Sequence, residues 1–539
     1  MKHDDDGGPA AAPQEAVATA PRATHGPGPD ELRRAAEVLE AAAADRALLA
    51  TLSHEERKRL LVAAGRVVHP DIEQKRRLVR TLRQSKRRRD EARDREQLAR
   101  TGIREARESA VFVAPAKQLP PGPEAETARE LLTPRTCYVC KAEFRRLHFF
   151  YDSMCPDCAE LNYAKRFQTT DLHGRVAVVT GARVKIGYQA ALKLLRAGAT
   201  VVAATRFPHD AARRYSLEPD FAEWKERLEV RGVDLRHSPS VEILCSELVR
   251  TLPRLDLLVN NACQTVRRPP GFYEHLVDFE EQALAALPQE LQPLVRAHHA
   301  SVSLLETASP RAMAALSPAD AEAKGGLVAW GGGGAGLGLR HSARLSQVRF
   351  DFDEQARRPD LFPDGARDAD LQQVDLRATN SWRLTLGDVP TPEMIEVQLV
   401  NAVAPFILCA RLKPLFLRTA GRDKHVVNVS AMEGIFSRGT KTDRHPHTNM
   451  AKAALNMLTL TSARDYVKDG IHMNAVDTGW VTDEDPWIHA SRKKDELGFQ
   501  PPLDIVDGAA RVLDPFLAGL ISGVHVHGKF LKDYQASSW

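Results

Sequence analysis

The 539-residue sequence lacks the features that would place it in a membrane or secreted class. No run of 18 or more apolar residues is present, which argues against a conventional transmembrane helix. The first residues, MKHDDDGGPAAAPQ, are acidic and contain no apolar h-region, so we predict no signal peptide. These absences predict a soluble cytoplasmic protein that has no membrane partner.

The composition is that of a chain able to bury a core, with 43% hydrophobic and 27% charged residues. At roughly 150 residues per domain, the length predicts three or four domains. The net charge of +4 hides a concentration of cations, because Lys75–Arg107 holds 14 Lys and Arg residues against five Asp and Glu. A nucleic-acid or acidic protein partner would bind this segment. Its mixed run RRRDEARDRE is equally typical of a solvated helix or a coiled-coil partner.

The pattern along the chain divides it into five segments. Residues 1–30 are rich in Ala, Pro, Gly and Asp and are predicted to be disordered. Residues 31–110 form a basic helical arm, and 111–134 a Pro-rich linker. Residues 135–170 are a compact Cys-rich segment, and 171–539 alternate between strand-like and helical patterns.

Capping signals place the helices of the arm. Ser53 followed by Glu56 is a capping box, and the helix that it opens is expected to end near Gly65. Pro70 fits the first turn of a longer basic helix that is expected to end near Arg107.

Four of the seven cysteines form two pairs with the spacing of metal ligands. Two CxxC knuckles 14 residues apart can supply the four thiolates of a tetrahedral, structural Zn²⁺ site, as in zinc ribbons; they are Cys137, Cys140, Cys155 and Cys158. The alternative is four unrelated cysteines or a redox pair. The other three, Cys245, Cys263 and Cys409, are expected to be ordinary buried thiols.

The segment from 171 onward predicts an α/β fold, a Rossmann-type doubly wound parallel sheet. Its buried strands read GRVAVVTGA, ATVVAAT, LEVRGVD, LDLLVNNA and HVVNVS, with helical patterns between them. The stretch at about 264–389 breaks this rhythm and is predicted to be an insertion. It leaves and re-enters the fold near the carboxyl ends of strands, which favours a cover over the substrate cleft; an oligomer contact is the alternative.

A turn after the first of these strands has the features of a phosphate site. It reads Thr180-Gly181-Ala182-Arg183-Val184-Lys185-Ile186-Gly187 and opens a helix, so that backbone N–H groups face an anion. Further along the chain lie Asp234, the run Asn260-Asn261-Ala262-Cys263, Asn401, the run NVSAMEG, Lys452 and the run NAVDTGWV. In this order the signals resemble the short-chain dehydrogenase/reductase family over residues 171–262 and 391–539. The resemblance implies a nicotinamide dinucleotide and hydride transfer between a carbonyl and an alcohol.

Charge favours NADP(H) over NAD as the cofactor. NAD-preferring enzymes carry an acidic residue after the second strand, whereas this place holds Thr205 and Arg206. A solvated loop arginine is the alternative. The residues that the resemblance assigns to cofactor binding are Thr180, Gly181, Lys185, Ile186, Gly187, Thr205, Arg206, Asp234, Asn260, Ala262, Lys452, Thr478 and Gly479.

The sequence departs from the family pattern at the phosphate turn and at the catalytic tetrad. Lys185 replaces the middle glycine of TGxxxGxG, and its ammonium either meets a phosphate or faces solvent. Asn401 and Lys452 match the tetrad, whereas Thr448 occupies the tyrosine position and Ala431 the serine position, with Ser430 beside it. A threonine hydroxyl is too weak an acid to replace a phenol.

Two substitutes for the missing acid are open. His447 or His445 could supply the proton, because histidine titrates in the right range; otherwise Tyr273 could reach the site. The leading hypothesis is thus an NADP(H)-dependent oxidoreductase, a homo-oligomer acting on a small carbonyl or alcohol. The alternative is a nucleotide-binding scaffold or sensor with little chemistry, whose arm contacts a partner.

Overall fold

The computed structural model describes residues 27–108, 129–308, 334, 336–350, 358–368 and 370–539. The predicted disordered segment therefore lies almost wholly outside the described residues, as does most of the predicted linker. The chain divides into two compact units, residues 1–89 and 90–539.

The first unit is helical. It contains α1 (Pro29–Ala44), the 3₁₀ turn η1 (Arg46–Thr51), α2 (His54–Val68) and the first part of α3 (Ile72–Ala99). Helix α2 starts at the predicted capping box, in which the Ser53 hydroxyl accepts from the Glu56 N–H. The predicted end at Gly65 is wrong by three residues, because a glycine inside an exposed helix costs only about 1 kcal/mol. No residue of α1 or α2 is buried within this unit.

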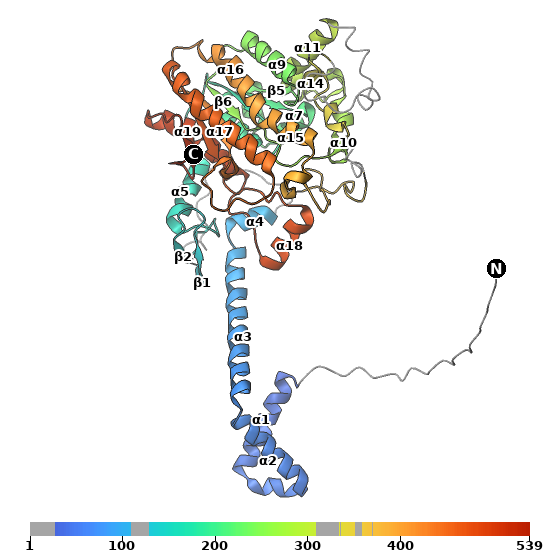
Figure 1. The fold of residues 1–539 in the computed structure, drawn as a ribbon, viewed down its shortest axis with the longest axis vertical. Coiled ribbons are helices and arrows are strands. Elements are labelled where there is room, and N and C mark those ends of the chain that lie inside the picture. The colour runs from blue at the N-terminus through green and yellow to red at the C-terminus, as the bar shows by residue number, and fades with distance from the viewer. Residues whose placement is uncertain (1–26, 109–128, 309–333, 335, 351–357, 369) are drawn as a thin grey trace, which may run out of the picture. The chain divides into compact units, whose positions relative to one another are not determined.

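The second unit carries the remaining elements (Figure 1). In chain order they are α4 (Gly102–Glu108), β1 (Glu130–Thr136), β2 (Glu143–Arg146), α5 (Pro156–Phe167), β3 (Val176–Thr180), α6 (Lys185–Arg196), β4 (Thr200–Thr205), α7 (Pro208–Ser216), α8 (Phe221–Trp224), η3 (Lys225–Arg227), β5 (Leu228–Gly232), α9 (Ser238–Thr251), β6 (Leu257–Asn260), α10 (Pro270–Glu280), η4 (Leu284–Ala286), α11 (Gln292–Ala308), α14 (Leu337–Arg340), η5 (Arg344–Gln347), η6 (Ser381–Arg383), η7 (Leu386–Asp388), α15 (Thr391–Gln398), the π-turn η8 (Leu399–Val403), α16 (Ala404–Phe416), β7 (Lys424–Ser430), η9 (Met432–Gly434), α17 (Pro446–Tyr466), η10 (Val467–Asp469), β8 (Ile471–Asp477), α18 (Trp487–Leu497), α19 (Ile505–Ser522), β9 (Phe530–Lys532) and β10 (Gln535–Ser537).

The basic helix is shorter than predicted, because α3 ends at Ala99 and a separate helix, α4, begins at Gly102. The break is made by tertiary contacts. The Gly102 N–H donates to the Phe149 carbonyl at 3.0 Å, and the Ile103 N–H donates to that of Phe150 at 2.9 Å. A side chain at Gly102 would start 2.7 Å from the Phe150 ring. The linker also ends earlier than predicted, since β1 starts at Glu130.

Eight strands form the central sheet, in the order β10-β9-β8-β7-β6-β3-β4-β5. All neighbouring pairs are parallel except β10 with β9. Helices α6, α7 and α19 cover one face and α9, α16 and α17 the other, each over a buried apolar layer. The predicted α/β fold with a doubly wound parallel sheet is therefore confirmed. The strand order reverses between β3 and β6, which is where such sheets bind ligands.

One continuous helical run, Thr391–Phe416, is long and apolar enough by composition to cross a membrane. Half of its most apolar window is buried inside the protein, where α16 packs against α9. The helix belongs to the core that covers the sheet, and a buried core helix has the same apolar composition as a membrane-spanning helix.

The insertion covers the edge strand β5 with helix α11. The Arg231 guanidinium donates to the Ala297 carbonyl at 2.7 Å, and the Gly232 N–H donates to Nδ1 of His298 at 3.2 Å. A side chain at Gly232 would start 2.6 Å from the His298 ring, so the helix and strand are in close contact. The insertion thereby protects a sheet edge that would otherwise be open to other chains.

This contact predicts a loss of stability in mild acid. Burial lowers the pKa of His298 to about 3, so the folded protein holds this ring neutral. The neutral ring contributes fully to the free energy of unfolding above about pH 6.5, the pKa of histidine in the unfolded state. Below that pH the unfolded state gains a proton, and this contribution falls by about 2 kcal/mol at pH 5. Urea unfolding at pH 7 and pH 5 should therefore show a smaller pH dependence in His298→Asn. Exposed His69→Asn is the control, and an unchanged pH dependence in His298→Asn would contradict the assignment.

Candidate functional site

A cavity of about 1510 Å³ opens at the carboxyl ends of the parallel strands. Parallel strands bring the residues that follow each of them to one edge of the sheet, far apart though they are in the chain. Those lining the cavity include Thr180, Gly181, Thr205, Arg206, Asp234, Asn261, Ala262, Ser430, Ala431, Thr478 and Gly479.

The predicted phosphate turn forms part of the cavity wall. Thr180 fixes it, because its hydroxyl accepts from the N–H groups of Asn261 and Ala262 at 3.1 and 3.0 Å. Gly181 has φ +67° and passes so close to Ala262 that a Cβ would start 2.8 Å from its Cα. Helix α6 then begins with no side-chain cap. Its first N–H groups are thus available to an anion in the cavity.

Lys185 replaces a glycine and retains the left-handed backbone conformation, with φ +56°. A residue with a Cβ pays about 1–2 kcal/mol for this conformation. Its side chain lines the cavity. Burial by itself would lower the pKa of Lys185, but the carboxylates of Glu484, Asp370 and Asp368 outweigh it and raise that pKa. The charge thus faces carboxylates from the insertion and from the loop after β8.

Two arginines lie near the end of β4, and among the described residues only Arg183 forms an ion pair, although the Arg206 charge also helps to lower the pKa of Asp234. Arg183 forms an ion pair with the buried Asp210 at 2.7 Å. Arg206 donates to the Tyr273 hydroxyl at 2.8 Å and lies over the Tyr273 and Phe207 rings, with 4.8 and 5.5 Å between its guanidinium carbon and the ring centroids. Among the described residues it has no ion pair, and it lines the cavity.

Two of the residues that the resemblance assigns to the cofactor are held by other groups. Asp234 pairs with Arg236 at 2.7 Å; burial by itself raises the pKa of Asp234, but Arg236 outweighs this and lowers it. Asn260 does not line the cavity, because its amide donates to Asn428 at 2.8 Å inside the sheet. Its neighbour Asn261 lines the cavity instead and ties the phosphate turn to β6. Cys263, expected to be buried, is exposed.

The two matching tetrad residues are both buried, and of the two only Lys452 lines the cavity. Lys452 on α17 donates from Nζ to the Val429 carbonyl at 2.8 Å. Asn401 lies in η8, and π-turns of this kind are frequent at functional sites. Its amide accepts from the Gln264 N–H at 2.8 Å and donates to the Gln264 carbonyl at 3.2 Å, which fixes the loop after β6.

Thr448 and Ala431 line the same cavity at the positions of the missing tyrosine and serine. Thr448 is buried, and its hydroxyl has no hydrogen-bond partner in the described part of the chain. Ser430 cannot replace a serine at 431 without moving, because its hydroxyl donates to Asn456 at 2.6 Å.

The three side chains considered as substitutes for the missing phenol, His447, His445 and Tyr273, contact other groups. His447 is buried with Nε2 3.7 Å from a Glu393 oxygen and does not line the cavity. His445 stacks on Trp382, with 3.8 Å between the ring centroids. Tyr273 lies on α10 and pairs with Arg206 at the end of β4, which β3 and β6 separate from β7. The positions of these side chains depend on packing of the insertion and of α15, which local sequence does not specify.

The cavity also contains an acid that the sequence analysis did not single out. Asp477 ends β8, is buried, and accepts from the Gly479 N–H at 3.2 Å. Burial raises the pKa of Asp477 to about 6. Its place directly before the Thr478-Gly479 turn was the signal that could have identified it.

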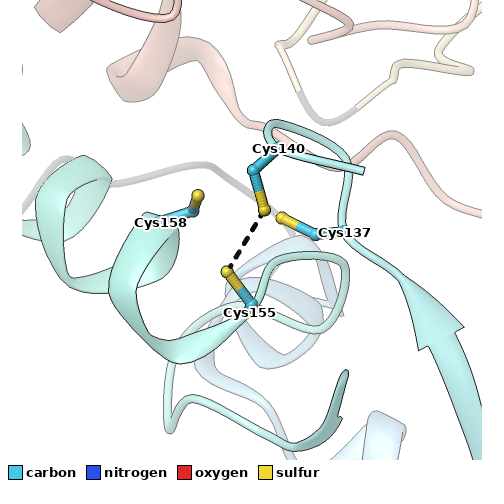
Figure 2. A group of neighbouring side chains, drawn as sticks. All are labelled: Cys137, Cys140, Cys155 and Cys158. Atoms are coloured by element: carbon cyan, nitrogen blue, oxygen red, sulfur yellow. Dashed lines mark hydrogen bonds between the residues drawn. The ribbon is translucent and has the colours of Figure 1, made fainter. Parts of the chain in front are cut away.

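The four clustered cysteines converge as predicted (Figure 2). Two come from the turn after β1 and two from the start of α5, and all four sulfurs lie within 4.8 Å of one another. The Cys140 and Cys155 sulfurs are 3.7 Å apart, and Zn–S bonds of about 2.3 Å in a tetrahedron require about 3.8 Å. Burial raises the pKa of Cys155 and of Cys158, whereas N–H groups of Cys155, Cys140 and Val139 outweigh burial at Cys137 and lower its pKa to about 7, so the fit to a metal rests on the spacing of the four sulfurs. The donor set therefore fits a tetrahedral zinc ion.

Comparison with known proteins agrees with this geometry. Two family models match the chain, one described as short chain dehydrogenase over residues 175–287 and one as Enoyl-(Acyl carrier protein) reductase over residues 379–495. The unmatched residues 288–378 fall within the predicted insertion. The chain thus has the α/β fold and the sequence signals of the family that these models describe. It belongs to the short-chain dehydrogenase/reductase family, in which it is a divergent member.

The relatives differ in how much of the chain they match. Uncharacterized protein R665 of Acanthamoeba polyphaga mimivirus is 30% identical over 392 residues, which is 71% of each chain. Retinol dehydrogenase 14 of Mus musculus is 32% identical over 116 residues, 19% of this chain and 34% of that protein. The solved angucycline C-6 ketoreductase LanV with bound NADP is 17% identical, covers 68% of this chain and 96% of its own, and gives a TM-score of 0.39.

Proposed function

We propose that the protein is an NADP(H)-dependent oxidoreductase that acts on a carbonyl or alcohol substrate. The observation that carries the choice of cofactor is Arg206, a cation that lines the cavity at the end of β4 and forms no ion pair among the described residues. A 2′-phosphate is the group that a guanidinium at this place pairs with. The uncapped start of α6 and the nearby Lys185 suit the pyrophosphate.

The chain's own residues would divide the work of the reaction. A bound nicotinamide would supply the hydride to a carbonyl carbon or accept it from an alcohol carbon, and a proton would have to reach or leave the attached oxygen. Lys452 would hold the nicotinamide ribose and supply positive charge, while Asn401 fixes the loop after β6. Thr448 offers a hydroxyl at the cavity wall but is a poor proton donor, so we expect slow turnover.

A scaffold or sensor role is the second candidate, and the tetrad supports it. The phenols that line the cavity in the described part of the chain belong to Tyr138 and Tyr273. Burial raises the pKa of Tyr138 to about 12, and Tyr273 is hydrogen-bonded to Arg206. Oxidation of NADPH with a broad panel of aldehydes and ketones distinguishes the two functions: consumption supports the oxidoreductase, and tight binding without consumption the scaffold.

The cysteine cluster is proposed to hold one structural zinc ion. Four thiolates leave no open coordination position for a water or substrate, which is the arrangement of structural sites. This zinc would not take part in the hydride transfer.

NADPH should bind more tightly than NADH, and Arg206→Ala should remove most of the difference. Loss of the paired phosphate is expected to weaken NADPH binding by about 10- to 150-fold, or about 1.5–3 kcal/mol, and to leave NADH unchanged. Titration of NADPH fluorescence measures both constants. Arg213→Ala is the matched control, because Arg213 pairs with Asp210 outside the cavity. Equal affinities for the two cofactors in the wild type would refute the assignment.

A further inference from the structure

The cysteine segment and the proposed cofactor site share one apolar core. Ile103, Tyr151 and Met154 of the cysteine segment and its flanking helix are fully buried against Val481, Leu503 and other residues that follow β8. Ile186 of the phosphate turn packs against this cluster and also against the core of the sheet. In Figure 1 the segment formed by β1, β2 and α5 lies beside α19, away from α10, α11 and α14. The cysteine segment therefore packs directly against elements that form the proposed cofactor site.

Tyr138, between the first two cysteines, makes the most direct connection. Its hydroxyl accepts from the Trp480 N–H at 2.9 Å. A side chain at Gly479 would start 3.1 Å from the same hydroxyl, so the phenol lies against this turn. Gly479, Trp480 and Tyr138 all line the cavity. The phenol therefore fixes the backbone of the loop after β8 where it forms the cavity wall.

Buried polar contacts hold the far end of this loop to the same segment. Arg107 of α4 donates to the Leu503 carbonyl at 2.6 Å. Arg166 of α5 pairs with Asp504 at 2.7 Å and with Asp507 at 2.8 Å, and all three side chains are buried. The Tyr151 hydroxyl donates to Asp507 at 2.5 Å. Helix α19 begins here, and a side chain at its Gly508 would start 2.8 Å from Ile186 of the phosphate turn.

We propose that metal binding by Cys137, Cys140, Cys155 and Cys158 controls dinucleotide affinity by fixing the loop 478–505, with Tyr138 as the positioning residue. The inference rests on the proposed function for its ligand, NADPH. Its physical basis is that the first knuckle holds Tyr138 between two metal ligands. Loss of the metal frees the knuckle and, with it, the contacts to Trp480 and the shared core around Ile186.

The first test compares zinc-loaded full-length protein with protein stripped by a chelator. Removal of zinc is expected to raise the Kd for NADPH at least tenfold. It should also accelerate tryptic cleavage at Arg492 and Lys494, two exposed sites on α18 within the loop. Circular dichroism must show that the central α/β fold persists. If the Kd and the cleavage rate are unchanged in zinc-free protein, the proposal is overturned. If the wild type binds no NADPH, the proposed function is overturned, and the cleavage rate alone decides whether zinc fixes the loop 478–505.

The second test keeps the metal and removes one hydrogen bond. Tyr138→Phe should retain zinc and raise the Kd for NADPH about fivefold, the effect of losing a single neutral hydrogen bond. Tyr163→Phe, in α5 of the same segment but outside the cavity, is the matched control and should leave the Kd unchanged. If Tyr138→Phe protein keeps its full zinc content and binds NADPH with wild-type affinity, Tyr138 is not the positioning residue. The apolar core alone would then fix the loop.

Discussion

Thr448→Tyr combined with Ala431→Ser is expected to raise NADPH-dependent carbonyl reduction at least 100-fold over the wild type. Position 448 precedes Lys452 by one helical turn on α17, so a phenol there lies on the same face as the ammonium. The ammonium lowers the phenol pKa, and a positioned acid contributes roughly 10²- to 10⁴-fold. Both replaced side chains already line the cavity, and the Thr448 hydroxyl has no partner to lose among the described residues.

Three controls make this result interpretable. Thr448→Phe with Ala431→Ser adds the same bulk without an acid and should give no gain. Lys452→Ala in the rebuilt protein should remove the gain, because the phenol then returns to a pKa near 10. His447→Ala should change little, since His447 faces Glu393 and does not line the cavity. Robust wild-type turnover that survives Lys452→Ala would show that the active site lies elsewhere.

Replacement of Cys140 and Cys155 by serine is expected to abolish zinc binding and unfold the segment around it. Structural zinc contributes an apparent 10–16 kcal/mol in small zinc-binding peptides at neutral pH, a large loss even for a segment that shares its apolar core with the loop after β8. Metal analysis should fall from close to one zinc per chain to none, and thermal unfolding should show an early transition.

An exposed cysteine outside the cluster supplies the matched control for this prediction. Cys263→Ser should retain both the zinc and the single unfolding transition, since Cys263 is exposed and its one side-chain hydrogen bond among the described residues is to Thr265 nearby. Freshly purified wild-type protein without zinc would contradict the metal assignment. The early transition reports the stability of the cysteine segment, whereas the Kd for NADPH reports its effect on the cofactor site. The two quantities are measured independently.

The α/β architecture and the phosphate turn could be predicted because each depends on local sequence. Buried parallel strands such as VAVVT have no polar face, and the turn from Thr180 to Gly187 needs glycines at fixed positions. The CxxC spacing likewise fixes a pair of thiolates within one short turn. The cysteine segment could thus be located from sequence, although the structure extends it back to Glu130.

The sequence by itself determined the order of strands and helices, the turn at Thr180, the Lys452 position, the absence of a phenol at 448 and the clustering of four cysteines. Only the tertiary structure decided which side chains share the cavity. It placed Tyr138 against Trp480, turned His447 towards Glu393 and paired Tyr273 with Arg206. These contacts join residues from 54 to 342 positions apart in the chain. They depend on packing between whole elements, and no local propensity or spacing encodes that packing.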